Sequence, residues 1–301
     1  MTFKSLQDNY LPQFELALKK AIQFNLSDQR SILEESINYC VTSPGKRIRP
    51  ILCMVTEKNM TGNISMSIPI SVAIELVHCY SLIHDDLPAM DNDDFRRGKP
   101  TCHKAYGEDI AILSGDVLNT YVFEYLANEL PNYTDHETSL TIIKEFAHAC
   151  GIHGMAGGQV LDLKSSNNNT ADLDQLKKIH HLKTGALLKS CITLISKVSS
   201  NDPEILNVMN SIGHHFGLLF QIIDDILDET GDLESIGKSP GKDLAQNKLT
   251  YVSLLGLDQA VNEAKNHKNK GLELIAQLPT PSEELSSIFN YIFDKGIQYA
   301  K

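Results

Sequence analysis

The sequence predicts an all-α fold: a large bundle of about ten helices that forms one domain over residues 1–301. Three observations favour it. Apolar residues recur at helical spacing along nearly the whole chain. No segment alternates apolar and polar residues for long enough to make a convincing strand. Residues 68–83 and 212–227 are apolar around most of a helical circumference, which predicts two buried helices at the centre of the bundle.

Prolines mark the starts of several helices. Pro50 opens one, and Pro203 stands at the first helical position of another, where its missing N–H costs nothing. Residues 280–283 (Thr-Pro-Ser-Glu) combine a proline with a capping pattern near the end of the chain. Residues 64–68 alternate like a strand, but the segment is short and Pro69 follows it directly, so we do not expect a sheet there.

A longer helix is predicted from Asp135 to about Leu163, because residues 134–137 (Thr-Asp-His-Glu) carry the pattern of a capping box. Two polar segments follow later in the chain. Residues 165–170 form a short loop, and residues 231–250 form a longer one with several glycines and lysines. We expect the longer loop to close over a ligand and exclude water. Neither segment has the composition of a linker between domains.

Charge and composition exclude several classes of function. The chain has 27 Lys and Arg against 38 Asp and Glu, a net charge of −11, so a nucleic-acid partner is not expected. The most apolar stretch, residues 68–83, contains Glu75 and His78, which argues against a membrane span. The N-terminus lacks the apolar core of a signal peptide, and six dispersed cysteines form no CxxC pair. These features predict a reduced, cytoplasmic protein.

An acidic cluster follows the first apolar helix. Asp85, Asp86 and Asp91 stand close together, and Arg96 and Arg97 come next. Such carboxylates repel one another unless cations neutralise them, and Mg²⁺ prefers carboxylate, phosphate and water oxygens. Arginine grips phosphate with two parallel hydrogen bonds. Acid, metal and arginine together predict a diphosphate site. A solvated acidic turn is the alternative for this run taken alone, and its spacing does not fit a calcium-binding EF-hand loop.

The spacing within this cluster requires a distorted helix. Asp85 and Asp91 are six residues apart, so an ideal helix would turn them about 240° away from each other. Both can face one metal cluster only if the helix breaks between them. Pro88 lies in that interval and lacks a backbone N–H, which makes a break there reasonable.

A second acidic cluster lies in the second apolar helix. Asp224 and Asp228 are four residues apart, so both face one side of the helix, and Asp225 lies beside Asp224. Unpaired like charges at this spacing destabilise a helix, and here they interrupt an apolar run. Two such clusters, each at the end of a buried helix, indicate a metal-binding function far more strongly than either one alone.

Cationic residues are also local. In an acidic chain they would form a positive rim suited to a small phosphorylated ligand, although each lysine alone is more often a solvated surface residue. The candidates are Lys46, Arg47, Arg49, Lys183, Lys238, Lys242 and Lys248.

Together these segments resemble the trans-prenyl diphosphate synthases, most closely those of the bacterial farnesyl type, over almost the whole chain. The motifs that carry the resemblance are GKRIRP, ELVHCYSLIHDDLPAMDNDDFRRGKPTCH, GDVL, GGQVLDL, HLKTGALL, FQIIDDILD and GKSPGKDLAQNKLTY. The resemblance implies an isoprenoid-synthase fold with a deep central cavity. It also implies a homodimer and three Mg²⁺ ions that join the two acidic clusters to an allylic diphosphate. Val252 departs from the family, where many members have proline after the Thr-Tyr pair; the change affects a helix start rather than the chemistry.

The resemblance also assigns residues to substrates and metal. It implies an isopentenyl diphosphate site at Lys46, Arg49, His78 and Arg97. It implies an allylic diphosphate side at Arg96, Lys183, Thr184, Gln221 and Lys238. Of these, the catalytic candidates beside the developing cation are Lys183, Thr184 and Gln221. The metal ligands it implies are Asp85, Asp91 and Asp224, with Asp86, Asp225 and Asp228 as lower-ranked members of the motifs. His84, beside the first motif, is expected to support its neighbours.

The reaction that the resemblance implies is the condensation of isopentenyl diphosphate with dimethylallyl or geranyl diphosphate to give farnesyl diphosphate. Geranylgeranyl diphosphate synthesis is the nearest alternative. A terpene cyclase would not need the GKRIRP segment, and a non-catalytic partner subunit would typically lack one acidic motif; this chain has all of them. Tyr80 and Ser81, one turn before Asp85, match the family's chain-length floor, and Tyr80 is expected to limit the product to C15.

Overall fold

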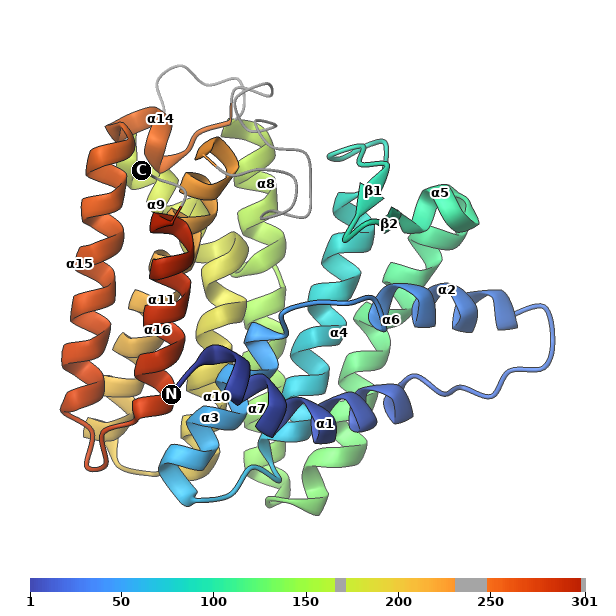
Figure 1. Ribbon diagram of the computed structural model, residues 1–301. Coiled ribbons are helices and arrows are strands. Elements are labelled where there is room, and N and C mark those ends of the chain that lie inside the picture. The colour runs from blue at the N-terminus through green and yellow to red at the C-terminus, as the bar shows by residue number, and fades with distance from the viewer. Residues whose placement is uncertain (166–171, 231–247, 299–301) are drawn as a thin grey trace.

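Helices make up nearly all of the described chain, which comprises residues 1–165, 172–230 and 248–298 of the computed structural model (Figure 1). The elements of the first half are α1 (Phe3–Ala21), α2 (Ser31–Val41), α3 (Ile48–Thr61), α4 (Ser67–Asp85), β1 (Phe95–Arg96), β2 (Lys99–Pro100), α5 (Cys102–Tyr106), α6 (Glu108–Glu129), η1 (Leu130–Asn132) and α7 (His136–Cys150). Those of the second half are α8 (Met155–Ser165), α9 (Leu173–His180), η2 (His181–Gly185), α10 (Ala186–Ser199), α11 (Pro203–Thr230), α14 (Tyr251–Leu255), α15 (Leu257–Ala276) and α16 (Glu283–Ile297). The all-α prediction is confirmed, with slightly more long helices than the ten expected.

Helices α4 and α11 form the centre of the bundle, as the two apolar segments predict. Helix α4 packs against α1, α3, α6 and α10, and residues 69–77 along it are all buried. Helix α11 packs against α10, α15 and α16. By length and composition α4 could cross a membrane, but 67% of its apolar window is buried inside the bundle, which is typical of a core helix. One contiguous core extends from Phe3 to Ile292.

The only sheet in the described part of the chain is a two-stranded hairpin that follows the first acidic cluster. Strands β1 and β2 are antiparallel, with Phe95 opposite Pro100 and Arg96 opposite Lys99. The turn between them has Arg97 at φ 54° and Gly98 at φ 76°. Figure 1 shows this hairpin beside the C-terminal end of α4, so its arginines lie next to the acidic cluster that the helix presents.

The helix predicted from Asp135 to Leu163 is wrong, because the chain breaks it into α7 and α8. Helix α7 ends when the N–H of Gly151 bonds to the carbonyl of Ala147. The chain then turns so tightly that a Cβ on Gly154 would lie 1.9 Å from the carbonyl oxygen of Ala149. Glycine permits this close approach because it has no Cβ. Glycine also destabilises the interior of a helix, and the apolar spacing that predicted one long helix does not take this into account.

The predicted starts of the helices are confirmed, but one of the predicted caps differs. Helix α11 begins at Pro203, and Pro50 lies in the first turn of α3. Helix α7 is capped by Asp135, whose carboxylate accepts from the N–H of Thr138 at 2.8 Å, so the expected capping box is replaced by a simple cap. Helix α16 is capped by Ser282.

Residues 64–68 form no strand. They lead into α4, and the carboxylate of Glu57, from α3, accepts from the N–H groups of Met66 and Ser67. A negative charge at this position also complements the positive end of the helix dipole. The first turn of the central helix is therefore capped by a residue from a neighbouring helix, which no local sequence signal could show.

The contact between α15 and α16 generates a stability prediction. A Cβ on Gly271 would lie 2.1 Å from Cε1 of Phe289, whose ring is fully buried against Phe216. We expect Gly271→Ala to lower the free energy of unfolding by about 1–3 kcal/mol, because the packed ring cannot retreat. Thermal unfolding followed by circular dichroism measures this, with Asn269→Ala on the exposed face of the same helix as the control. Equal Tm values for the two variants would show that the contact is loosely packed.

Candidate active site

The first acidic cluster is formed where the central helix α4 ends. The helix stops at Asp85, and the chain turns back so that the N–H of Asp91 bonds to the carbonyl of Asp85 at 2.8 Å. A second bond joins the N–H of Asp93 to the carbonyl of Asp86 at 3.2 Å. Pro88 lies in this turn. The break that the six-residue spacing demanded is thus present, and it returns Asp91 to the end of the helix beside Asp85.

Helix α8 and the π-helical segment η2 face this cluster. The amide of Gln159 donates to Asp85 Oδ1 at 2.8 Å, and the ammonium of Lys183 donates to Asp162 Oδ2 at 2.5 Å. The two elements approach so closely that a Cβ on Gly158 would lie 2.2 Å from the backbone nitrogen of Lys183. A π-helical turn, often found at functional sites, carries both Lys183 and Thr184. Gly158 therefore sets the distance from Lys183 to the acidic cluster.

The carboxylate of Asp85 is short of positive charge. Burial raises its pKa to about 6, Lys183 and Arg96 oppose the shift, and Asp91 and Asp86 add to it. A raised carboxyl pKa means that the folded protein disfavours the charged form. Lys183 stays protonated: burial works against its charge, but Asp162 and Asp85 more than compensate, so its pKa is raised. The site has a net deficit of cations beside Asp85.

The second acidic cluster divides into one exposed and two buried carboxylates. Asp224 is exposed, whereas Asp225 and Asp228 are buried. Asp225 Oδ2 accepts from the N–H of Tyr251 at 2.7 Å, which anchors the start of α14, and its other oxygen lies 3.8 Å from His180 Nε2. Asp225 thus holds the protein together at this point, and Asp224 is the member of the motif that is open to a ligand.

The exposed Asp224 lies near residues of the other clusters. It is within electrostatic range of Lys46 and Arg49, at the start of α3, and of His180. The negative charge of Asp162, the partner of Lys183, acts to raise the pKa of His180. Burial lowers the pKa of His180 to about 4, so it is neutral and contributes no charge of its own. These electrostatic interactions show that the GKRIRP segment, α8 and α11 lie close to one another.

Arg49 is a cation of the site that keeps an unused hydrogen-bond donor. Its Nε atom is buried and has no hydrogen-bond partner among the described residues, and its guanidinium lies 6.0 Å above the ring of Phe220. An orphaned buried donor is costly unless a ligand satisfies it. Burial also lowers the pKa of Arg49, and Glu75 opposes this shift. An anion placed here would satisfy both the charge and the donor.

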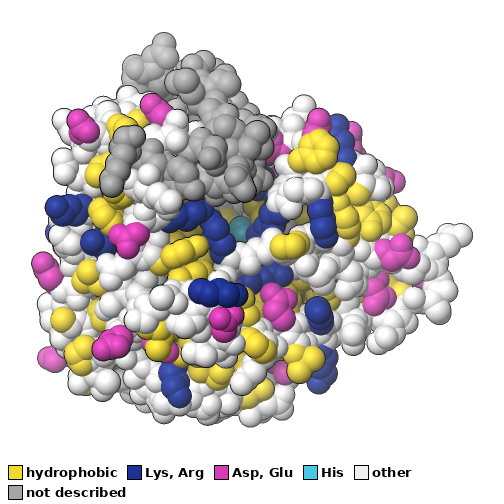
Figure 2. All heavy atoms as spheres, in the orientation of Figure 1, with side chains coloured by type: hydrophobic (Ala, Val, Ile, Leu, Met, Phe, Trp, Pro, Cys, Tyr) yellow, Lys and Arg dark blue, Asp and Glu magenta, His cyan; other side chains and the backbone are white. Residues whose placement is uncertain are grey.

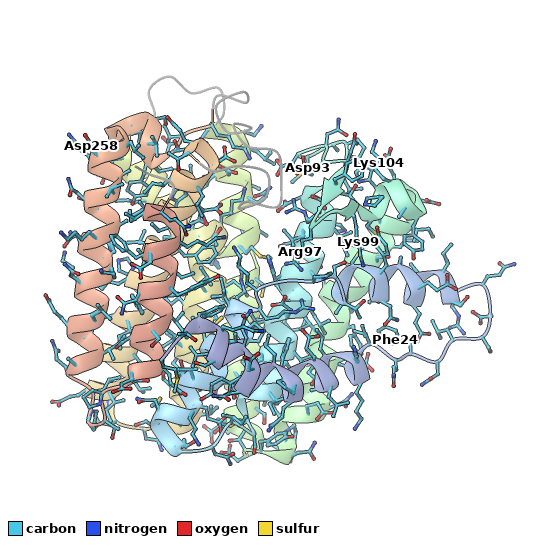
Figure 3. All side chains as sticks on the ribbon, viewed as in Figure 1. Phe24, Asp93, Arg97, Lys99, Lys104 and Asp258 are labelled. Carbon is cyan, nitrogen blue, oxygen red and sulfur yellow. The ribbon has the colours of Figure 1, made fainter. Side chains whose placement is uncertain are left out.

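Arg97 and His78 lie near Arg49. A Cβ on Gly45 would lie 3.0 Å from Arg97 Nη1, so the hairpin contacts the GKRIRP segment directly. Figure 3 shows Arg97 on the inner side of the hairpin. The pKa of His78 lies well below its ordinary value because of burial and the positive charges of Arg49 and Arg97, so this side chain is a neutral hydrogen-bonding group. Figure 2 shows Lys and Arg side chains gathered around a hollow on this face.

Two other arginines are already paired. Arg47 is buried, and it donates to Glu75 at 2.7 Å, to Glu15 at 2.9 Å and to the carbonyl of Val41 at 2.9 Å. Arg96 binds Asp86 through two nitrogens, at 2.6–2.9 Å. In the structure as described, Asp86 and Arg96 are therefore paired with each other.

Thr184 and Gln221 lie on adjoining elements. A Cβ on Gly217 would lie 3.1 Å from the Cα of Gly185, so α11 and η2 pack backbone against backbone. Gln221, which is buried, stands one turn after Gly217, and Thr184 precedes Gly185. His84 packs on Gly115, and its Nε2 lies 3.1 Å from the carbonyl oxygen of Ile112, so it joins the end of α4 to α6.

The loop expected to act as a lid falls mostly outside the described residues, and with it Lys238 and Lys242. Lys248 is described, and its ammonium lies 3.8 Å from Asp91 Oδ1. It also acts electrostatically on Asp162. This end of the segment therefore reaches the first acidic cluster from the side opposite the hairpin.

Three residues of the site were not predicted: Gln159, Asp162 and His180. Gln159 and Asp162 are three residues apart on α8, so both face the same side of the helix. That spacing within GGQVLDL was the available signal, because a lysine as buried as Lys183 needs an acidic partner. His180 gave no signal of its own, since a histidine at a helix end has many structural roles.

The donor set fits magnesium. Asp85, Asp91 and Asp224 are oxygen ligands of the kind that Mg²⁺ prefers, and the raised pKa of Asp85 shows that a cation beside it would be favourable. Within the described ranges, no three acidic, histidine or cysteine side chains already converge on one metal-sized point. Mg²⁺ commonly takes one or two carboxylates and completes its shell with water and substrate phosphates, so a site divided between two helices suits it.

Comparison with known proteins agrees with this geometry. Residues 30–292 match the family described as polyprenyl synthetase. The chain is 41% identical to a farnesyl diphosphate synthase of Micrococcus luteus over 89% of its length and 90% of the relative's. It is 39% identical to a geranylgeranyl diphosphate synthase of Cyanophora paradoxa, with 88% of each chain covered. A solved geranyltransferase structure from Legionella pneumophila superposes with a TM-score of 0.86 at 32% identity, covering 97% of each chain. The protein belongs to the polyprenyl synthetase family.

Proposed function

We infer that this member of the family is a farnesyl diphosphate synthase, which joins isopentenyl diphosphate to dimethylallyl or geranyl diphosphate. The observation that carries the choice of product is the position of Tyr80. Its partly buried ring lies 5.7 Å from that of His84, and desolvation raises the pKa of its hydroxyl to about 12, with Cys150 and Asp85 adding to the shift. Tyr80 lies on α4 five residues before Asp85 and within electrostatic range of Cys150, the last residue of α7, and we expect the tail of a growing product to extend past it.

The allylic diphosphate binds between the two acidic clusters. Lys183, held protonated by Asp162, stabilises the charge that develops on the leaving diphosphate. Asp85, Asp91 and Asp224 would hold Mg²⁺, three ions by analogy with the family, and the metal would supply positive charge to neutralise the diphosphate. Thr184 and Gln221 present oxygens to the allylic cation, and the apolar walls of the bundle keep out water that would trap the cation as an alcohol.

Isopentenyl diphosphate binds on the other side, against Lys46, Arg49, His78 and Arg97. Arg49 and Arg97 carry unneutralised positive charge in a half-buried setting, where each contact with phosphate is strong. The double bond of isopentenyl diphosphate attacks the allylic carbon, and the departing diphosphate takes the proton that is then lost. The sequence offers no obvious side-chain base for this step.

The enzyme forms a homodimer in the cytoplasm. Support for the dimer comes from exposed apolar side chains that cluster on α6, α7, α8 and their connections: Ile112, Leu113, Tyr133, Leu140, Ile152, Val160 and Leu163. A monomer rarely leaves so many large apolar groups in water. The mass in solution, measured by light scattering, tests this assignment.

Geranylgeranyl diphosphate synthesis is the second candidate, because relatives of nearly equal similarity make that product by name. The two activities differ in how far the product tail can extend past Tyr80. The chain-length experiment at the end of this section decides between them.

The metal site gives the first prediction. Asp85→Asn keeps the hydrogen-bond acceptor for Gln159 but removes the charge, so it should lower kcat by at least about 100-fold. Metal-free, the same variant should be more stable than the wild type by at most about 3 kcal/mol above pH 6, because the raised pKa of Asp85 means that its ionisation costs stability there. The gain should vanish below pH 4, where Asp85 is protonated in both states.

Steady-state rates at saturating Mg²⁺ and Tm values in chelator measure the two effects. Asp224→Asn should lose activity to a similar extent. Glu229→Gln, exposed on the same helix, is the matched control and should behave as the wild type. Near-normal rates for either aspartate variant would contradict the two-cluster site.

The substrate assignment gives the second prediction. Arg49→Gln and Arg97→Gln should each raise the KM for isopentenyl diphosphate by roughly 10- to 100-fold and change the KM for geranyl diphosphate little, because each loses a charge-assisted phosphate contact of about 1.5–3 kcal/mol. Arg96→Gln should affect the allylic substrate more. Initial-rate kinetics with each substrate varied supply the measurement, with the exposed Arg30→Gln as the control. Equal effects on both substrates would show that the two sides are assigned wrongly.

The chain-length floor gives the third prediction. Tyr80→Ala should shift the main product from C15 to C20 or longer, because the ring that stops the tail is removed. Tyr80→Phe keeps the ring and should still give C15, which separates bulk from the hydroxyl. Chromatography of the products formed from geranyl diphosphate measures the distribution. A wild type that already makes mainly C20 would support the geranylgeranyl alternative instead.

A further inference from the structure

Three cysteines line one small cavity beside the isopentenyl diphosphate side of the site. They are Cys40 on α2, Cys79 on α4 and Cys102 at the start of α5, and the cavity of about 40 Å³ also contacts His78 and Arg97. Cys79 and Cys102 are buried, and Cys40 is partly exposed. Nothing in the proposed reaction uses a thiol, so this cluster needs its own explanation.

Cys40 and Cys102 line the same cavity, and their thiols interact with each other. They form a side-chain hydrogen bond, which raises the pKa of Cys40 and lowers that of Cys102. The helices around them are firmly joined. The hydroxyl of Tyr39 donates to the carbonyl of Pro100 at 2.7 Å, and its ring meets that of Tyr106 edge to face at 5.5 Å. The two sulfur atoms are therefore held together by the fold and do not meet by chance.

Each thiol lies one residue from a group that supports a segment carrying a substrate-binding arginine. Val41, after Cys40, accepts from Arg47 at 2.9 Å, and Arg47 stands within the GKRIRP segment. Thr101, before Cys102, donates to the carbonyl of Asp93 at 2.7 Å, which closes the hairpin that carries Arg97. A change in the distance between the thiols must move these two supports relative to each other.

We propose that Cys40 and Cys102 form an oxidation site at which a peroxide converts the dithiol to a disulfide, and that this disulfide weakens the adjoining isopentenyl diphosphate site. The second half of the proposal rests on the proposed function, and the first half does not.

The chemistry needs one equivalent of hydrogen peroxide. The thiolate of Cys102 attacks one peroxide oxygen; the O–O bond breaks, a sulfenic acid forms, and the hydroxide released takes up the proton that Cys102 lost, giving water. The sulfur of Cys40 then attacks the sulfenic sulfur. The S–S bond forms as the S–O bond breaks, and the hydroxide that leaves takes the Cys40 proton as a second water. Two thiols are oxidised and one peroxide is reduced.

The disulfide would disturb the isopentenyl diphosphate site by shortening the distance between the two sulfur atoms. Its S–S bond is about 2.05 Å long, well below the contact distance of two sulfur atoms, so it would draw the ends of α2 and α5 that carry the two cysteines toward each other. Arg97 and the GKRIRP segment move with these supports. A misplacement of about 1 Å in a site that positions reactants is known to cost large factors in rate.

A second contacting pair provides the matched control. Cys53 on α3 and Cys191 on α10 also form a side-chain hydrogen bond, but both are fully buried in the core. Peroxide has no path to them through the cavity that contains Cys40. Oxidation should therefore select the Cys40–Cys102 pair.

The experiment treats the full-length protein with hydrogen peroxide and maps the products by non-reducing peptide mass spectrometry. The expected result is a Cys40–Cys102 cross-linked peptide, lighter by two hydrogen atoms. The KM for isopentenyl diphosphate should rise about tenfold, equal to about 1.4 kcal/mol, and a dithiol reductant should reverse the change. Cys102→Ser should give neither effect, whereas Cys191→Ser should still give both.

Absence of the Cys40–Cys102 peptide, or a cross-link between Cys53 and Cys191 instead, would overturn the oxidation site. Inhibition of Cys102→Ser equal to that of the wild type would overturn the link between this disulfide and the substrate site. A reduced protein with no condensing activity would reject the proposed function alone, since the peptide map decides the oxidation site without any measurement of activity.

Discussion

Mutual repulsion among carboxylates at the ends of two buried helices is the constraint on which this structure depends. Helix α4 is one of the most completely buried segments, yet it delivers Asp85 and Asp86 to its C-terminal end, where the helix dipole also disfavours negative charge. The fold offsets only part of this cost. Arg96 neutralises Asp86, whereas Asp85 keeps a raised pKa of about 6. A bound Mg²⁺ ion would offset the remaining deficit of positive charge and could in turn bind an anionic diphosphate.

The arginines of the GKRIRP segment differ in whether the protein itself neutralises them. Arg47 is surrounded by acceptors and ties α1, α2 and α4 together. Arg49, two residues later, keeps a buried nitrogen without a partner among the described residues. Sequence position cannot separate two arginines in one GKRIRP segment, but their hydrogen bonds do: the paired one stabilises the fold, and the other is available to an anion.

Much of this could be predicted because the signals are local or periodic. The apolar circumference of residues 68–83 predicted a core helix, and the six-residue spacing of Asp85 and Asp91 demanded the helix break that the structure contains. Other features depend on distant contacts. The break at Gly154 depends on a close backbone approach, and the pairing of Lys183 with Asp162 depends on how η2 packs on α8. Asp225 has a structural role and Asp224 stays exposed because Tyr251 packs on the side of α11 that carries Asp225.

The central claim is that metal and diphosphate complete one charge arrangement that the protein leaves unfinished. Thermal unfolding of the wild type with Mg²⁺ alone, with inorganic diphosphate alone and with both tests it most directly, because a ligand stabilises the fold in proportion to its binding. The account predicts that the increase in Tm with both ligands exceeds the sum of the two separate increases, since each completes the site for the other. An increase with Mg²⁺ alone as large as that with both would show that the carboxylates already form a complete metal site, and would contradict the account.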